Sequence, residues 1–162
     1  MILLLVRHAQ AGERDPAEWP DDRSRPITAR GRKIQARVAR ALGEMGLTPD
    51  AIVTSPWTRA AETADILARE LDLTAPPIVS EALAAEPDPA RLDADIGERG
   101  RKEIVAAVGH SPWVEEWAGI LLAGTPDGLP IDFPKSGVLV LALDRVAPRA
   151  ATLRAFLRPK LL

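Results

Sequence analysis

The sequence Ile2-Leu3-Leu4-Leu5-Val6, close to the start of the chain, is an unbroken apolar run that leads directly into Arg7 and His8. Five consecutive apolar residues are typical of a β-strand buried on both faces, because a half-exposed strand alternates apolar and polar residues. Such a strand lies inside a sheet that helices cover on either side. The stretch therefore predicts an α/β protein with a largely parallel sheet.

Working outward from this strand, the chain alternates helix-like and strand-like segments. Apolar residues recur every three to four positions after Thr28, which predicts an amphipathic helix that ends at Gly46. Its expected buried positions are Ile34, Val38, Leu42 and Met45. Further strands are expected at residues 51–54, 77–79, 103–108, 137–143 and 151–157.

Three more helices are expected where a capping side chain precedes a proline, namely at Ser55-Pro56, Asp88-Pro89 and Ser111-Pro112. The alternation predicts a three-layer α/β sandwich with a mostly parallel central sheet of about six strands flanked by helices. The length of 162 residues suits one domain, spanning 1–162.

Composition excludes several classes of function. Lys and Arg total 21 against 23 Asp and Glu, so the chain lacks the positive charge with which a nucleic-acid binder neutralises phosphates. The absence of cysteine excludes disulfides, thiolate zinc sites and thiol catalysis. The first apolar run is too short for a signal peptide or a membrane span, so we expect a cytoplasmic protein that does not bind membranes.

The composition also predicts thermal stability. The chain has 15 Pro, two Met, two Gln and no Asn, and thermophile proteins use few heat-labile residues and stiff loops. A GC-rich genome is the alternative explanation, since it also favours Ala, Arg and Pro. A melting midpoint within the mesophile range of roughly 45–65 °C would contradict the thermophile interpretation.

Candidate site residues follow from the rule that ligands bind at the carboxyl ends of parallel strands. Arg7 and His8 follow the first strand, Arg59 lies in the first helical turn after the second, and His110 follows the fourth. Two arginines, the two histidines of the chain and two helix starts suit an anion such as phosphate. By pattern alone, ordinary loop residues and surface charges remain an alternative for each of them.

Metal and nucleotide sites have weaker support. The two histidines have no close spacing and no adjacent acidic cluster, so we expect no metal and no cofactor. No glycine-rich nucleotide loop is present. Residues 125–162 carry no recognisable chemistry and are expected only to complete the sheet.

Four segments in order resemble one known family. Leu5-Val6-Arg7-His8-Ala9 is similar to the Arg-His-Gly signature of the histidine phosphatase superfamily, the clan of phosphoglycerate mutases and acid phosphatases, with Ala9 in place of the usual glycine. The other segments are Pro26–Gly31 with Gln35-Ala36, Ser55–Ala60 with Thr63-Ala64, and Val108–Ser111. Asp22–Thr28 is similar to the corresponding stretch of the SixA-type protein-histidine phosphatases.

The resemblance implies a phosphoglycerate mutase-like fold and phosphoryl transfer through a covalent phosphohistidine. His8 would attack phosphorus as a neutral imidazole, with Arg7, Arg59 and a protonated His110 all disfavouring a positive charge on it. The two arginines would bind the phosphoryl oxygens, and His110 would stabilise charge in the transition state. Glu81 is the candidate general acid and Glu86 the other choice, with ordinary loop charges as the alternative for both.

The expected substrate is a phosphohistidine on a signalling or phosphotransfer protein. An imidazole leaves more readily than an alkoxide, and the short connection before the fourth strand leaves little chain for a lid. The segments 12–25, with Trp19, and 124–136, with Lys135, are candidate rims of an open groove. The alternatives are a broad-specificity phosphomonoesterase acting on small phosphate esters, a non-catalytic phosphate or phosphoprotein binder and, more remotely, a mutase. The oligomeric state is not predicted.

Overall fold

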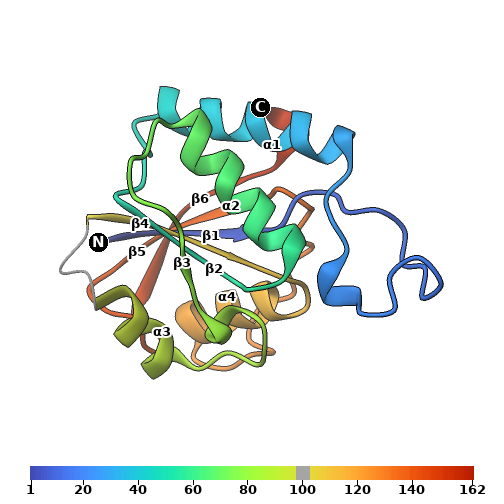
Figure 1. Cartoon of the computed structure of the whole chain (residues 1–162). Helices are drawn as coiled ribbons and strands as arrows, with labels where there is room; N and C mark the ends of the chain where they lie inside the picture. Colours follow the sequence, from blue (N-terminus) through green and yellow to red (C-terminus); the bar gives the residue numbers. More distant parts are fainter. Residues whose placement is uncertain (98–102) are drawn as a thin grey trace.

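The computed structural model describes residues 1–97 and 103–162. Six strands form one sheet in the order β3-β2-β4-β1-β5-β6, with helices on both faces (Figure 1). The strands are β1 (Ile2–Arg7), β2 (Ala51–Thr54), β3 (Ile78–Val79), β4 (Ile104–Gly109), β5 (Val138–Leu143) and β6 (Ala151–Leu157). The predicted α/β fold with its six-stranded, mostly parallel sheet is confirmed.

Among the described strands, β5 alone runs against the others. β1 pairs in parallel with β4, and β2 pairs in parallel with both β4 and β3. β5 is antiparallel to β1 and to β6, so β6 regains the direction of β1. The ends of β1, β2 and β4 and the beginning of β5 therefore meet at one edge of the sheet, which we call the carboxyl edge.

Helices cover the two faces of the sheet as the unbroken apolar strand predicts. Their bounds are α1 (Ala29–Glu44), α2 (Thr58–Glu70), α3 (Pro89–Gly97) and α4 (Trp113–Ala123), with short 3₁₀ turns η1 (Asp22–Ser24), η2 (Glu81–Leu83) and η3 (Pro159–Leu161). Leu4 and Val6 of β1 pack toward α1 and α2, whereas Leu3 and Leu5 pack toward α3 and α4. All four side chains are fully buried, which explains why this strand has no polar alternation.

The predicted caps are right for α1 and wrong for α2 and α4. Thr28 Oγ1 accepts a hydrogen bond from the Gly31 backbone at 3.0 Å, and Gly46 ends the helical region in the left-handed conformation at φ 72°. Helix α2 instead begins at Thr58, because the Ser55 backbone still donates to Val108 O across the sheet at 3.0 Å.

At α4 the predicted start is displaced in the same way. Ser111 does not cap the helix; its hydroxyl donates to Glu115 Oε1 at 2.6 Å, and Pro112 occupies the N-cap.

The buried stripe predicted for α1 also differs at its last position. Met45 is the C-cap residue just beyond the end of α1, and it is 50% exposed.

Candidate active site

The carboxyl edge brings the predicted residues together. Arg7 and Gly109 are partners in the β1–β4 register, and His8 donates its backbone N–H to Gly109 O at 3.0 Å. Ser55 is tied to the same strand through Val108 O. His8, Ser55 and His110 therefore follow three neighbouring strands at the same level of the sheet. The ring centroids of His8 and His110 are 5.1 Å apart.

His8 is a buried, neutral imidazole whose proton position is set by its neighbour. Its Nδ1 lies 2.7 Å from Ala9 O, and because a carbonyl only accepts, Nδ1 carries the proton. The lone pair on Nε2 faces Arg59 Nε at 3.3 Å. Burial, helped by the charges of Arg59, Arg7 and Lys135, lowers the pKa of His8 to about 3. At neutral pH the ring therefore presents an unprotonated Nε2 to the site.

His110 is neutral as well, which corrects the expectation of a protonated His110. Burial, followed by the charges of His8, Arg59 and Arg7, lowers its pKa to about 2. Its Nε2 hydrogen-bonds Ser55 Oγ at 2.8 Å. Its Nδ1 is buried without a partner among residues 1–97 and 103–162. The expected positive charge on His110 is wrong because the spacing of residues along the chain does not reveal that this side chain is buried.

Arg59, in the first turn of α2, is held in place by the loop before α1. Its Nη1 donates to Asp22 O at 2.8 Å, and its Nη2 lies 3.2 Å from Asp22 Oδ2. The guanidinium also lies 4.6 Å from the centre of the Trp57 ring. Only 5% of Arg59 is exposed, and burial lowers the pKa of its guanidinium. A buried cation directed at His8 Nε2 is suited to an anionic group at that atom.

The second arginine, Arg7, is the last residue of β1 at the carboxyl edge. Its Nη1 donates to Phe133 O at 2.5 Å, and its Nε is buried without a partner among the described residues. An unpartnered buried N–H has a desolvation cost that an anion would relieve. The segment before β5 thus holds a site residue, although the sequence assigns residues 125–162 no chemistry.

Aromatic rings line the side of the site next to His110. The Trp57 ring lies 4.5 Å from His110 and 5.7 Å from Trp113, measured between ring centroids. Trp57 and Trp113 are half-buried, so they form a wall rather than part of the core. This apolar wall, together with Arg59 over Trp57, limits access of water to His110.

Three residues that the sequence analysis did not place among the site residues organise the site. Thr63 Oγ1 accepts from the Ala9 backbone at 2.9 Å and donates to Arg59 O at 2.6 Å, joining the segment after β1 to α2. Ser55 binds His110, and Asp22 binds Arg59. Ser55 and Thr63 belong to one of the segments that resemble the family, and Asp22 opens another. The resemblance therefore includes these residues but does not indicate which residues they contact.

Neither predicted acid bonds to these residues. Glu81, at the start of η2, and Glu86 are both exposed, and neither has a side-chain hydrogen bond to His8, Arg7, Arg59 or His110 in the described part of the chain. Asp22 is the carboxylate that does reach the site. A hydrogen bond from Arg25, with the charge of Arg59, lowers the pKa of Asp22, so it is a poor proton donor.

Two further searches cover residues 1–97 and 103–162. No group of three acidic, histidine or cysteine side chains there is placed to hold a metal ion. None of the helices in these ranges is both long enough and apolar enough to span a membrane.

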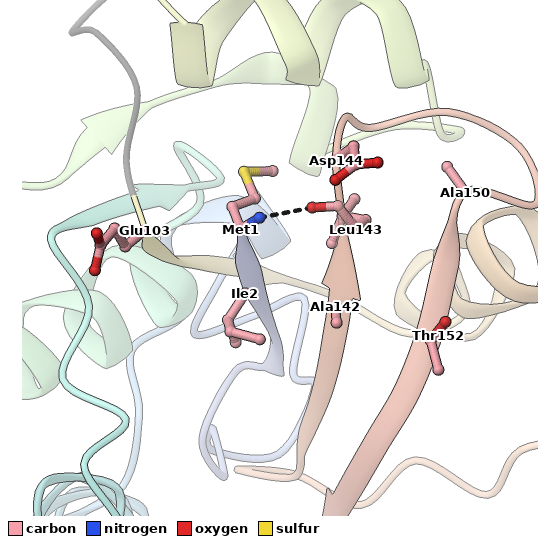
Figure 2. Close-up of a pocket in the computed structure, with 8 residues that line it drawn as sticks. All are labelled: Met1, Ile2, Glu103, Ala142, Leu143, Asp144, Ala150 and Thr152. Atoms are coloured by element: carbon pink, nitrogen blue, oxygen red, sulfur yellow. Dashed lines mark hydrogen bonds between the residues drawn. The ribbon is translucent and has the colours of Figure 1, made fainter.

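A hollow of about 790 Å³ lies at the edge of the sheet opposite the carboxyl edge. Figure 2 shows its walls, formed by the starts of β1 and β6 and the end of β5, and the Met1 amine that donates to Leu143 O at 2.7 Å. It contains none of the predicted site residues, because β1 separates Ile2 at this edge from Arg7 at the other. The residues predicted to bind phosphate lie at the carboxyl edge instead.

Known proteins resemble this chain in sequence and in fold. The family model described as histidine phosphatase superfamily (branch 1) matches residues 3–86. An uncharacterized protein of Picosynechococcus sp. (strain PCC 7002) is 34% identical over 146 residues, which cover 87% of this chain and 84% of that protein.

Two solved structures share the fold at lower identity. The protein histidine phosphatase SixA complexed with tungstate has a TM-score of 0.80 at 24% identity, with 99% of each chain covered. The putative phosphohistidine phosphatase SixA from Agrobacterium tumefaciens has a TM-score of 0.75 at 24% identity, covering 98% of this chain and 97% of that one. At these identities the likeness establishes a common fold.

Proposed function

The chain belongs to the histidine phosphatase superfamily, and from this premise we propose that it hydrolyses phosphohistidine on a signalling or phosphotransfer protein, with His8 as the nucleophile. The observation that carries the proposal is the state of His8. Its Nδ1 proton is held by Ala9 O at 2.7 Å, and the pKa of the ring is lowered to about 3. The Nε2 lone pair is therefore available at neutral pH without a general base.

In the first step, His8 Nε2 attacks the phosphorus of the substrate. A P–N bond forms at His8 and the P–N bond to the substrate imidazole breaks. Where the substrate ring carries a proton on its other nitrogen, it departs as a neutral imidazole. In the second step, water attacks phosphorus, the bond to His8 breaks with the pair returning to Nε2, and inorganic phosphate leaves after losing a proton to solvent.

The cations of the site are suited to stabilise both steps. Arg59 directs Nε at His8 Nε2, and Arg7 has a buried, unpartnered Nε. Their guanidinium groups match phosphoryl oxygens geometrically better than lysine would. We expect His110, whose Nδ1 has no partner among the described residues, to donate a hydrogen bond to the same oxygens. Positive side chains of this kind supply the field that phosphoryl transfer needs, so we expect activity to persist in EDTA.

The positions of the acids favour a phosphohistidine over a phosphate ester. An alkoxide leaving group needs a proton from an acid at the site, whereas the protonated imidazole described above does not. Glu81 and Glu86 are exposed, and Asp22 is held ionised by arginines. Neither glutamate hydrogen-bonds His8, Arg7, Arg59 or His110 in the described part of the chain, which supports a leaving group that needs no acid.

The test compares phosphate release, in EDTA, from a phosphohistidine-bearing phosphotransfer domain and from p-nitrophenyl phosphate. We expect a kcat/KM at least tenfold higher for the phosphoprotein, and loss of both activities in His8→Ala. Acid-labile radiolabel should appear on the wild-type chain and be absent from the variant.

Glu81→Gln provides the matched control for the general acid. We expect it to retain phosphohistidine turnover within about twofold. Equal or better turnover of the ester would instead identify a phosphomonoesterase. Because p-nitrophenolate leaves without a proton, the acid is tested on an alkyl ester such as phosphoserine, where loss of activity in Glu81→Gln would identify Glu81 as the general acid. Strict dependence on a divalent metal, or normal turnover by His8→Ala, would contradict the mechanism itself.

A further inference from the structure

A smaller hollow of about 270 Å³ is lined by four basic residues and by Gln10, two residues after His8. Arg30 comes from the first turn of α1, Lys135 from the segment before β5, and Arg158 and Lys160 from the end of the chain. These segments are far apart in sequence, and Figure 1 shows the C-terminal end of the chain beside α1. Arg37 of α1 fixes this arrangement by donating to Pro159 O at 2.6 Å. We call this hollow the basic groove.

Most of the positive charge in the basic groove is not neutralised. Arg158 pairs with Asp132 at 2.8 Å. Arg30, Lys135 and Lys160 are exposed, and within residues 1–97 and 103–162 none of them forms an ion pair with a carboxylate. Three unpaired cations therefore face one hollow on a chain whose net charge is only −2.

Ser136 links the basic groove to the nucleophile. Its backbone N–H donates to the carbonyl oxygens of Arg7, at 3.1 Å, and His8, at 3.3 Å. Its side chain is 1% exposed, lines the groove, and its Oγ has no partner among the described residues. The two backbone bonds tie the segment that carries Lys135 to the end of β1. Lys135, next in sequence, is close enough for its charge to act on His8.

We propose that the basic groove binds acidic side chains of the phosphoprotein substrate while its phosphohistidine lies at His8. The inference rests on the proposed function and adds what selects the substrate. Arg7 and Arg59 are enough to bind a single phosphoryl group. The cations of the groove come from three segments, and this arrangement suits several carboxylates on a protein surface. Complementary charge at a rim of this kind speeds association and selects partners.

The test uses Arg30→Glu/Lys160→Glu, since neither residue belongs to the catalytic machinery. KM for the phosphohistidine-bearing domain should rise at least tenfold with kcat little changed, and kcat/KM for p-nitrophenyl phosphate should stay within about twofold. Raising the salt concentration should weaken wild-type turnover of the phosphoprotein and have less effect on the variant. Arg91→Glu on α3, across the sheet from α1, is the matched control and should change neither substrate.

A binding measurement separates this inference from the proposed function. A fluorescein-labelled hexaglutamate peptide should bind the wild type and Arg91→Glu alike, and the double variant at least tenfold more weakly. If the peptide fails to bind the wild type, or binds the double variant equally well, the groove proposal is wrong whatever the turnover. If the peptide binds as expected but the phosphoprotein is not hydrolysed, the proposed function fails and the groove remains an acidic-peptide site.

Discussion

Ser55 and His110 are joined by a hydrogen bond of 2.8 Å between Oγ and Nε2, and both side chains are at least 99% buried. Ser55 Oγ also accepts the Trp57 backbone N–H at 3.2 Å, which holds the hydroxyl beside His110. We expect the serine to donate its own proton to Nε2, which would place the ring proton of His110 on Nδ1, the atom that has no protein partner within the described residues.

Replacing Ser55 should therefore impair His110 without removing it. We expect Ser55→Ala to lower kcat about tenfold, since the loss of one buried hydrogen bond costs about 1–3 kcal/mol. The ¹⁵N shifts of the His110 ring should move toward a mixture of tautomers. Ser55→Thr, which keeps the hydroxyl, is the control and should recover most of the rate. Unchanged ring shifts in Ser55→Ala would show that Ser55 does not position His110.

Asp22 should matter for phosphate binding through Arg59, and its neighbour Asp21 offers a matched comparison. Asp22 contacts Arg59 through its backbone oxygen and its carboxylate, whereas the Asp21 carboxylate contacts only Arg23 among the described residues. We expect Asp22→Ala to weaken competitive inhibition by inorganic phosphate about three- to tenfold, within the range of one charge-assisted bond. Asp21→Ala should leave the inhibition constant unchanged, and an equal effect of both variants would refute the role of Asp22.

Acidification should destabilise the fold between pH 7 and pH 4 because of the two histidines. Their folded-state pKa values are lowered to about 3 and about 2 from 6.5, so the unfolded chain binds more protons in this window. Stability is then present above pH 6.5 and is lost as the pH falls.

The size of this effect can be measured by urea unfolding at several pH values. Each histidine should cost on the order of 1–2 kcal/mol between pH 7 and pH 5. His8→Gln and His110→Gln should each flatten the pH dependence by about that amount. Parallel curves for the wild type and both variants would contradict the lowered pKa values.

Gly31 of α1 should tolerate no side chain. A Cβ at this position would lie 2.3 Å from the Gln10 backbone oxygen, and Gln10 is two residues from His8. We expect Gly31→Ala to destabilise the fold by about 1–3 kcal/mol, the usual cost of overpacking, and to lower activity. In the same helix, Gly43→Ala meets only the end of the Leu71 side chain and gains helix propensity, so its unfolding free energy should be unchanged or higher. Thermal or urea unfolding measures both.

Much of the fold can be predicted from the sequence because the patterns that indicate it are local. The apolar run at residues 2–6 and the periodicity after Thr28 depend on which residues are buried, and the packing confirms both except at Met45. Helix starts after Ser55 and Ser111 are misjudged because these serines have bonds that no local pattern reveals, one to the sheet and one to Glu115.

The site is predictable to the extent that strand ends determine it. His8, Arg59 and His110 are brought together because parallel strands end at one edge. The pattern does not predict the long-range contacts of the site. These are the contacts of Asp22 with Arg59, of Phe133 O with Arg7, and of Ser136 with the end of β1. These contacts depend on how loops fold over the edge. The role of Glu81 and the thermal stability of the chain remain predictions.

The reversed direction of β5 has a consequence for how this molecule can diversify. It delivers residues 133–136 to the carboxyl edge at the beginning of a strand, after a long connection from α4. That connection and the terminal turn η3 build the walls of the basic groove, while β1, β2 and β4 carry the histidines and arginines. The cations proposed to bind a partner and the residues proposed to bind phosphate thus come from largely separate stretches of chain, which meet where Phe133 O binds Arg7. Charge substitutions in the groove segments are therefore expected to change the binding of an acidic partner while leaving the histidines in place.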